Sequence, residues 1–298
     1  KKYKMTLITG SNGFLGKHIV KELKVKPVTV GINSKCDIIV DLSKEIPLLP
    51  KVDLVIHSAG KAHCVPKTDL EKQAFFDVNV KGTENLLKGL EESGFPKQFV
   101  FISSVSVYGV ALGDHIDEEH PLMAIDPYGK SKILAEKLIQ DWCSKNNVIC
   151  TILRLPLVVG KNPPGNLGAM IHAIRKGFYF NIAGGTARKS MVLADDISKV
   201  LLQVAEVGGI YNLTDGYHPN FYEMSLLISK QLGKEKVSNM PFWIARFFAF
   251  FGNMMGSKFP INSDKLNKLN ATLTFDDSKA RRAFGWSPSS VLENFKIE

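Results

Sequence analysis

Cysteine is scarce in this sequence. The 298 residues contain four cysteines and no CxxC pair: Cys36, Cys64, Cys143 and Cys150. No paired histidines accompany them, so neither a zinc site nor a disulfide framework is expected. We therefore predict that the protein uses no metal and that its thiols stay reduced, as in a cytoplasm.

Long hydrophobic stretches are also missing. No apolar run reaches the roughly 18 residues that a membrane-spanning helix needs, and the first residues form no apolar leader. The longest candidate is FWIARFFAFF at residues 242–251, which is short and contains an arginine. We expect it to be a helix packed within a small second domain, with a helix lying at a membrane interface as the alternative. The chain is predicted to have no membrane span and to be cytoplasmic.

Clusters of charge of one sign are absent as well, although the formal net charge is +9. Lysines are scattered among acidic residues and never form a run of five or six like charges, so no nucleic-acid partner is expected. The positive excess would instead attract a phosphorylated small substrate. With 45% hydrophobic and 22% charged residues, and no repeat, the composition is typical of a globular protein.

Short apolar runs alternate along the chain with helical patterns. Leu15, Ile19 and Leu23, for example, recur at four-residue intervals, as on one face of a helix. Such alternation predicts an α/β fold with a Rossmann-type, doubly wound parallel sheet, which binds ligands at the carboxyl ends of its strands. The expected strands are residues 6–9, 28–32, 38–40, 54–57, 99–103, 149–155 and 209–213.

The composition changes after residue 155, where loops rich in glycine and proline such as GKNPPGN appear. We predict that residues 1–160 and about 191–215 form a dinucleotide-binding domain. A smaller, discontinuous substrate domain is then assembled from residues of about 161–190 and 216–298.

The stretch TGSNGFLG lies between the first expected strand and the first expected helix. Gly10 can make the tight turn, Gly13 lets the backbone approach a pyrophosphate, and Gly16 lets the helix lie close to the sheet. The N–H groups of Phe14 and Leu15 at the helix start then face the phosphates. A turn that merely needs glycine is the alternative, but the strand, glycine and helix context favours a bound dinucleotide.

The stretch PYGKSK places Tyr128 and Lys132 at i and i+4, on one face of a helix. Tyrosine has a reference pKa of about 10, so a tyrosine base needs a neighbouring cation, which Lys132 is placed to supply. Upstream, FVFISSVSVYG ends an expected strand with Ser103 and Ser104, where the nicotinamide and substrate would meet it. A hydroxyl there can bind a sugar oxygen and share the proton that Tyr128 handles; an ordinary strand-end hydroxyl is the alternative.

These motifs together resemble the extended short-chain dehydrogenase/reductases of the NAD-dependent epimerase/dehydratase family, typified by UDP-galactose 4-epimerase. The matching pieces cover nearly the whole chain and include TGSNGFLG, DLS, VIHSAG, DVNVKGTENLL, FISSVSVYG, PYGKSK and DSKARRAFGW. The resemblance implies that Tyr128 is the catalytic acid/base and Ser104 the catalytic hydroxyl. It also implies that Lys132 is the partner of Tyr128 and binds the nicotinamide ribose.

Further cofactor contacts follow from the same resemblance. Asp41 and Leu42 would flank the adenine, Ala59 and Gly60 would line the cofactor, and Asn79 would steady the structure around it. Two long helices, carrying Asn79 and Lys132, would form a homodimer interface as in relatives.

The identity of the cofactor stays open at the end of the second strand. NAD-specific relatives carry an acidic residue there that binds the adenosine ribose, whereas this chain has Asn33, Ser34 and Lys35. These side chains could accommodate a 2′-phosphate, so both NAD and NADP are expected candidates, with Asn33 among the contacts.

The substrate phosphates must be bound differently from those in UDP-galactose 4-epimerases, because Leu157 replaces the asparagine that touches them there. Asn166 and Leu167, which open the next helix, are one expected source of contacts. Arg188 and Lys189 are another, with solvated surface charges as the alternative.

The resemblance implies an enzyme that epimerises C4 of a UDP-hexose or UDP-N-acetylhexosamine through transient oxidation to a 4-keto sugar. Val105 and Ser106 stand where dehydratases carry Asp and Glu, which argues against dehydration. The stretches LRLPLVVG, AGKAH and ARKSMVLADD resemble a subgroup from surface-polysaccharide pathways that includes reductases of UDP-4-keto-6-deoxy-sugars. An NAD(P)H-dependent ketoreductase is therefore the alternative function, and a non-catalytic dinucleotide-sensing regulator is a third. His63 within AGKAH is expected either to line the pocket or to be an ordinary packing histidine.

Overall fold

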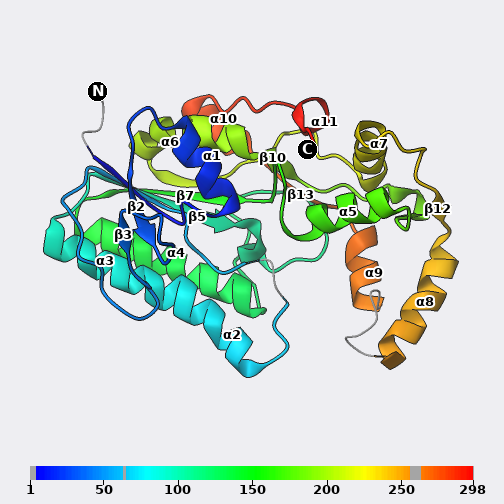
Figure 1. Ribbon diagram of the computed structural model, residues 1–298, viewed down its shortest axis with the longest axis horizontal. Coiled ribbons are helices and arrows are strands. Elements are labelled where there is room, and N and C mark those ends of the chain that lie inside the picture. Colours follow the sequence, from blue (N-terminus) through cyan, green and yellow to red (C-terminus); the bar gives the residue numbers. More distant parts are fainter. Residues whose placement is uncertain (1–4, 63–64, 256–262, 298) are drawn as a thin grey trace.

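The computed structural model describes residues 5–62, 65–255 and 263–297, so His63 and Cys64 lie outside the described residues. Its centre is a seven-stranded parallel sheet with the strand order β11-β7-β5-β4-β1-β2-β3 (Figure 1). All of the expected strands are confirmed to within one residue at each end. They are β1 (Thr6–Thr9), β2 (Val28–Gly31), β3 (Ile38–Ile39), β4 (Leu54–His57), β5 (Gln98–Ser104), β7 (Ile149–Leu155) and β11 (Gly209–Asn212).

The strand order reverses at β1, which pairs with β2 on one side and with β4 on the other. From β1 the chain runs outward to β3 and then returns to β4, from which it continues outward to β11. In a doubly wound sheet, the crevice at such a reversal, outside the carboxyl ends of the strands, is where ligands bind. The predicted Rossmann-type architecture is confirmed, and it places the glycine turn after β1 at this crevice.

Helices cover both faces of the sheet (Figure 1). One face packs through Ile8 and Ile19 in a core shared with Ile197, and the other through Leu7 and Leu90. On the first face lie α1 (Phe14–Glu22), α6 (Ala194–Val207) and α10 (Ser278–Phe284). On the second lie α2 (Asp69–Phe76), the π-helical turn η1 (Asp77–Lys81), α3 (Gly82–Ser93) and α4 (Pro127–Lys145).

The smaller lobe expected from residues of about 161–190 and 216–298 stays a prediction, and outside the central sheet the chain forms three short parallel strand pairs. The pairs are β6 (Gly113–Ile116) with β13 (Leu273–Phe275), β8 (Leu157–Val159) with β10 (Met191–Leu193), and β9 (Asn181–Ile182) with β12 (Asn239–Met240). The helices are α5 (Gly165–Lys176), α7 (Phe221–Gln231), α8 (Phe242–Met255), α9 (Ser263–Asn270) and α11 (Val291–Asn294), with short 3-10 turns η2 (Val105–Tyr108) and η3 (Ala183–Gly185).

The core shows which late segments accompany the sheet. Ala280, Phe284 and Trp286 belong to the same buried cluster as Ile8 and Ile197. We therefore propose that α10 belongs to the dinucleotide-binding domain, although it lies within the segment assigned by sequence to the substrate domain. The remaining domain bounds stay predictions.

The apolar stretch at 242–251 does form a helix, α8. Its small residues Ala245 and Ala249 are buried, whereas most of its aromatic side chains are exposed. The expectation that the helix packs in a small second lobe thus holds for one face only. Among the described residues, no helix has both the length and the apolar character needed to cross a membrane.

Candidate active site

The glycine turn after β1 is shaped by backbone crowding. Gly10 has a φ of +71°, and a Cβ atom there would lie 2.6 Å from the Ala59 nitrogen. A Cβ at Gly16 would collide with the Gly10 carbonyl, because α1 lies directly against the turn. The Gly13 N–H closes the turn by donating to the Gly10 carbonyl at 3.0 Å. Side chains at Gly10 and Gly16 are thus excluded by the backbone itself, which leaves the start of α1 accessible.

The first turn of α1 begins at Gly13, and no described side chain caps it. The N–H groups of Phe14 and Leu15 are therefore among the donors that lack an intrahelical acceptor, at the positive end of the helix dipole. Their side chains point elsewhere, because Leu15 is in the core and Phe14 lines a separate groove beside α6. This arrangement is suited to holding a phosphate through the backbone.

A cavity of about 290 Å³ opens beside the glycine turn. Seven of the predicted cofactor residues line it together: Gly10, Gly13, Asn33, Asp41, Leu42, Ala59 and Gly60. The Asp41 carboxylate accepts hydrogen bonds from the Ser43 hydroxyl at 2.6 Å and from Lys44, and these contacts lower its pKa. The Asn33 side chain accepts from the Lys35 N–H at 2.9 Å, and no carboxylate follows β2 at this point. The site fits the adenosine half of a dinucleotide, with or without a 2′-phosphate.

Tyr128 lies in the first turn of α4, which begins with Asp126 accepting from the Gly129 N–H at 3.0 Å. Burial raises the pKa of the Tyr128 phenol, and the neighbouring hydroxyls of Ser104 and Ser106 oppose this rise. The lowering of this pKa that is expected from Lys132 together with a bound nicotinamide stays a prediction, and in the chain alone the pKa is raised. The physical reason is that desolvation of the phenolate outweighs the two hydroxyl contacts.

Lys132, one turn further along α4, is almost fully buried. Its ammonium donates to the Ile102 carbonyl at 2.9 Å and lies 4.6 Å from the centre of the Phe101 ring. Burial lowers its pKa to about 8, and the charge of Glu136 opposes that shift. A Cβ at Gly60 would lie 3.2 Å from the Lys132 nitrogen, so the lysine reaches the edge of the cofactor cavity.

Asn79 fixes the loop beside Lys132 from within the π-helical turn η1. Its side-chain oxygen accepts from the Lys61 N–H at 2.7 Å, and its amide donates to the Ser131 hydroxyl at 2.8 Å. Local π-helical turns are frequent at functional sites because they redirect a side chain. Asn79 thereby ties the loop after β4 to the helix that carries Tyr128 and Lys132.

A buried ion pair beneath the site was missed by the sequence analysis. Arg154 and Glu136 are 3% and 1% exposed at their side chains, and their charged atoms are 2.8 Å apart. The Ser103 hydroxyl donates to the same carboxylate at 2.5 Å, so it belongs to this buried network, and its predicted cofactor contact stays a prediction. Arg154 also donates to the Tyr108 hydroxyl at 3.2 Å. The only signals in the sequence were an acid four residues after Lys132 and an arginine within an apolar strand.

His57, which lies in the VIHSAG motif, has no role predicted from the sequence. Its ring hydrogen-bonds the hydroxyls of Thr9 at 2.7 Å and Thr83 at 3.0 Å, and it stacks on Phe101. Burial, together with the charge of Lys132, lowers its pKa to about 3. His57 is therefore neutral and positions the end of β4 under the cofactor cavity.

The predicted substrate contacts lie on two segments of the smaller lobe. Asn166 and Leu167 open α5, whose N-cap makes no side-chain hydrogen bond, but the Leu167 side chain is buried in the core. Arg188 donates to the Tyr217 and His218 carbonyls, each at 3.2 Å. Lys189 donates to the Lys268 carbonyl at 3.0 Å, and burial lowers its pKa.

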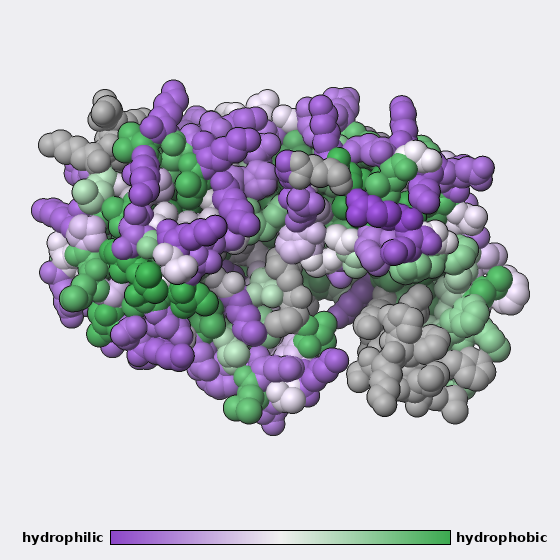
Figure 2. Space-filling view, in the orientation of Figure 1, coloured by the Kyte–Doolittle hydropathy of each residue, from purple (hydrophilic) through white to green (hydrophobic). Residues whose placement is uncertain are grey.

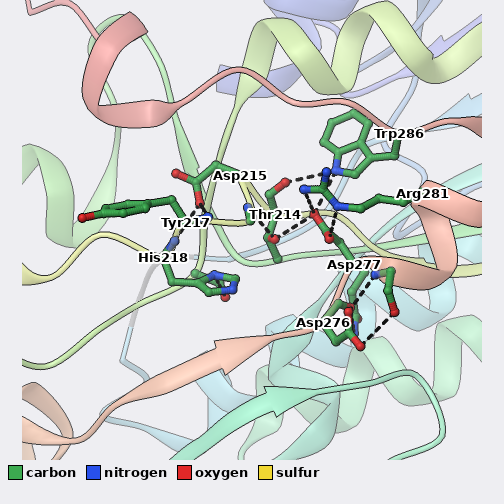
Figure 3. Close-up of polar contacts among 12 residues, drawn as sticks. Thr214, Asp215, Tyr217, His218, Asp276, Asp277, Arg281 and Trp286 are labelled. Carbon is green, nitrogen blue, oxygen red and sulfur yellow. Dashed lines mark hydrogen bonds and ion pairs between the residues drawn. The ribbon is translucent and has the colours of Figure 1, made fainter.

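A further cavity, of about 430 Å³, is lined in part by Tyr217 and His218, whose carbonyls Arg188 contacts. Figure 3 shows the polar contacts among the residues around it. Its acidic groups are satisfied by their neighbours. Asp277 pairs with Arg281 at 2.7 Å and accepts from the Thr214 hydroxyl at 3.0 Å, while the Trp286 indole donates to the Thr214 carbonyl at 3.0 Å. The motif DSKARRAFGW, which supplies three of these residues, thus fastens the end of the chain to the loop after β11.

Comparison with known proteins places this geometry in a family. Residues 6–214 match the NAD dependent epimerase/dehydratase family. The N-acetyl-alpha-D-glucosaminyl-diphospho-ditrans,octacis-undecaprenol 4-epimerase of Escherichia coli O157:H7 is 31% identical over 231 residues, covering 74% of this chain and 69% of that protein. The UDP-glucose 4-epimerase of Vibrio cholerae is 27% identical over 317 residues, covering 98% of this chain and 94% of that protein.

A solved structure shares the fold. MoeE5 in complex with UDP-glucose and NAD superposes with a TM-score of 0.74 at 21% identity, covering 97% of this chain and 95% of that chain. The family match spans β1 through β11 and so includes the glycine turn, the Ser104 strand end and the Tyr128–Lys132 pair. The resemblance seen in the sequence is confirmed: the chain is an enzyme of the extended short-chain dehydrogenase/reductase type and belongs to the NAD dependent epimerase/dehydratase family.

Proposed function

We propose that this enzyme inverts C4 of a UDP-linked hexose or N-acetylhexosamine with the help of NAD or NADP. The observation that carries the proposal is the set of half-buried Ser104 and Tyr128 and buried Lys132, with Lys132 beside Gly60 of a glycine-lined cavity. The relatives support it, since the Vibrio cholerae protein that matches 98% of this chain is a UDP-glucose 4-epimerase. Val105 and Ser106 supply no acid or base for eliminating water.

Proton transfer is assigned to Tyr128. In the proposed reaction, its phenol oxygen takes the proton of the C4 hydroxyl and returns it after inversion. Because burial raises the phenol pKa, the phenolate needs a nearby positive charge, and Lys132 is a cation at neutral pH. Ser104 hydrogen-bonds the same sugar oxygen and holds it against the phenol.

The cofactor is held mainly by the backbone. Gly10, Gly13 and the N–H groups of Phe14 and Leu15 bind its pyrophosphate in this proposal. Asp41 with Leu42 would flank the adenine, and Ala59 with Gly60 would line the middle of the site. Lys132 would bind the nicotinamide ribose, while Asn79 holds the loop beside it. The bound cofactor would supply the hydride acceptor and donor for C4.

The loop after β2 accommodates either dinucleotide. Asn33 and Ser34 can hydrogen-bond a ribose, and Lys35 offers a positive charge to a 2′-phosphate. On the substrate side, Arg188, Lys189 and the start of α5 at Asn166 are proposed to bind the pyrophosphate of the UDP group. Their contacts to carbonyl groups in the chain alone would be exchanged for phosphate oxygens.

A reductase of UDP-4-keto-6-deoxy-sugars is the second candidate. It would use Ser104, Tyr128 and Lys132 once in each turnover and then release oxidised cofactor. The absence of a carboxylate directly after β2, among the described residues, favours this candidate because such a loop suits NADPH.

One experiment separates the two candidates. Freshly purified protein is denatured, and any released nucleotide is identified by mass spectrometry. Stoichiometric NAD, followed by interconversion of UDP-glucose and UDP-galactose or of their N-acetyl forms, supports the epimerase. Empty protein that binds NADPH and reduces a 4-keto sugar supports the reductase.

The role of Tyr128 is tested with Tyr128→Phe. We expect this variant to lose at least about a thousandfold in kcat, because both proton transfers pass through the phenol, and to retain the cofactor. Tyr179→Phe, which removes a hydroxyl from another partly buried tyrosine, is the matched control and should keep full activity. Undiminished turnover by Tyr128→Phe would refute the mechanism.

A further inference from the structure

Helix α8 packs against the rest of the protein through small side chains. Ala245 and Ala249, one turn apart, are fully buried and cluster with Leu266 of the neighbouring helix α9. Ile182 and Met240 pack against this cluster from the β9–β12 pair. The two helices lie side by side at one end of the molecule (Figure 1).

The opposite face of α8 carries large aromatic side chains that are more than half exposed. Trp243, Phe247 and Phe250 are 72%, 59% and 61% exposed. Their i, i+4, i+7 spacing places them on one side of the helix, away from Ala245 and Ala249. Figure 2 shows hydrophobic residues over the part of α8 that is coloured. The helix therefore directs its small residues inward and its large apolar residues outward, which is the reverse of ordinary core packing.

These exposed aromatic side chains contribute little to folding. A large aromatic side chain has roughly 150–250 Å² of surface, and more than half of it is exposed for each of the three. Exposed apolar surface gathered on one element can mark an interaction site.

The charge around the helix indicates the chemistry of the partner. Arg246 is the one charged residue of α8, and the helix has no acidic residue. The sequence between residues 230 and 250 contains four basic residues and one acidic residue, Glu235. The whole chain carries a net charge of +9. Aromatic side chains beside Arg246, on a helix without acidic residues, are complementary to a bilayer surface, where anionic headgroups lie above an apolar interior.

We propose that α8 docks the enzyme onto the surface of an anionic phospholipid bilayer. In this arrangement Trp243, Phe247 and Phe250 enter the boundary between headgroups and acyl chains, and Arg246 stays among the phosphates. The helix has 14 residues and is therefore about 21 Å long, too short to cross a core of about 30 Å, so it lies parallel to the surface.

A second copy of the chain fits this face less well. Two copies meeting through α8 would bring Arg246 of each chain toward the α8 of the other, which has no acidic residue to pair with it. Like charges at an interface are repulsive, whereas the same residues attract anionic headgroups. The charge pattern thus favours the bilayer.

Flotation with vesicles tests the proposal. The full chain is mixed with vesicles of phosphatidylcholine alone or of phosphatidylcholine with phosphatidylglycerol, and the floating fraction is measured. We expect binding to the anionic vesicles that weakens with salt and with the loss of phosphatidylglycerol. Replacing Trp243, Phe247 and Phe250 together by Ser should weaken binding by more than about tenfold, because three apolar anchors are lost.

The matched control is a triple Ser variant of Leu48, Leu70 and Leu112, which are 86%, 84% and 71% exposed on other parts of the surface. It removes as many exposed apolar side chains and should bind like the unaltered protein. Thermal melts verify that both triple variants are folded, and Arg246→Glu should weaken binding to the anionic vesicles alone. If the α8 variant dissociates a dimer in sedimentation, the face is an interface between copies and the proposal is wrong. It is equally wrong if the unaltered protein fails to float or if the α8 variant floats as well.

This inference does not depend on the proposed reaction. The α8 variant should retain turnover of a water-soluble nucleotide sugar, and Tyr128→Phe should retain vesicle binding. Failure of one proposal therefore leaves a distinct signature from failure of the other.

Discussion

Replacing Glu136 by Gln removes one charge from a buried ion pair while keeping its shape. Arg154 is 3% exposed and would keep its positive charge with no carboxylate beside it. Removing one partner of such a pair destabilises a protein by about 3–5 kcal/mol, because the remaining charge is buried without compensation. Ser103 would also lose a charge-assisted contact to the carboxylate. We therefore expect Glu136→Gln to lower the free energy of unfolding by about 3–5 kcal/mol.

Chemical denaturation followed by circular dichroism measures this loss. Asp69→Asn is the matched control, since it breaks the exposed pair of Asp69 with Lys72, whose side chains are 96% and 51% exposed. An exposed pair is worth about 0–1 kcal/mol, so the control should unfold almost like the unaltered protein. A Glu136→Gln variant as stable as the control would refute the reasoning that the pair is held without water.

The same substitution also changes the chemistry of the site. Glu136 opposes the burial that lowers the pKa of Lys132, so its neutralisation should lower that pKa below about 8. The limb of the pH–activity profile that reports loss of the Lys132 proton should then move to lower pH. A merely structural role would reduce activity without moving this limb.

Three further predictions follow from the same geometry. Burial lowers the pKa of Lys132 from 10.5 to about 8, so between these pH values the folded protein binds fewer protons than the unfolded chain. The free energy of unfolding should therefore rise with pH across this window. Denaturation at several pH values should show this slope for the unaltered protein and not for Lys132→Met. Gly16→Ala places a methyl group against the Gly10 carbonyl and should abolish cofactor retention or folding. In the control Gly82→Ala, the Cβ meets nothing closer than 3.6 Å, so this variant should melt at or above the temperature of the unaltered protein. A folded Gly16→Ala protein with bound cofactor would show that the turn can shift. Asn79→Ala breaks the contacts to Lys61 and Ser131 and should lower cofactor affinity in titration by about tenfold without altering the sheet; unchanged affinity would remove Asn79 from the site.

The sheet could be predicted from sequence because its strands are short, apolar and regularly separated. Buried parallel strands such as β1 and β4 read as continuous apolar runs, which the surrounding helices do not imitate. The glycine turn could also be predicted, since Gly10 and Gly16 are positions where a Cβ has no room. The prediction of cofactor residues such as Asp41 and Ala59 rested instead on the family resemblance. In the structure, both residues line the same cavity.

The polar network under the site could not be predicted, because it joins residues far apart in the chain. Ser103, Glu136 and Arg154 meet only once β5, α4 and β7 are packed together. Nothing local in the sequence indicated that Ser103 faces Glu136 while Ser104 faces Tyr128. The exposed aromatic face of α8 escaped prediction for a related reason, since a run of phenylalanines does not reveal which side of the helix the protein covers.

Burial links the two ionisable groups of the active site to the ion pair below them. It disfavours the charged form of each group, so it raises the pKa of the Tyr128 phenol and lowers that of the Lys132 ammonium. At neutral pH both groups therefore hold their protons. Once the phenol gives up its proton, the phenolate and the ammonium of Lys132 lie one helical turn apart on α4, and burial makes the attraction between such charges stronger than it would be in solvent. That attraction exists only while Lys132 stays charged, and the nearby carboxylate of Glu136 is what opposes its neutralisation. In the proposed mechanism, the acid/base capacity of Tyr128 thus depends on Glu136, whose carboxylate is engaged by Ser103 and Arg154. This is why the pH profile of Glu136→Gln is more informative than its activity at a single pH.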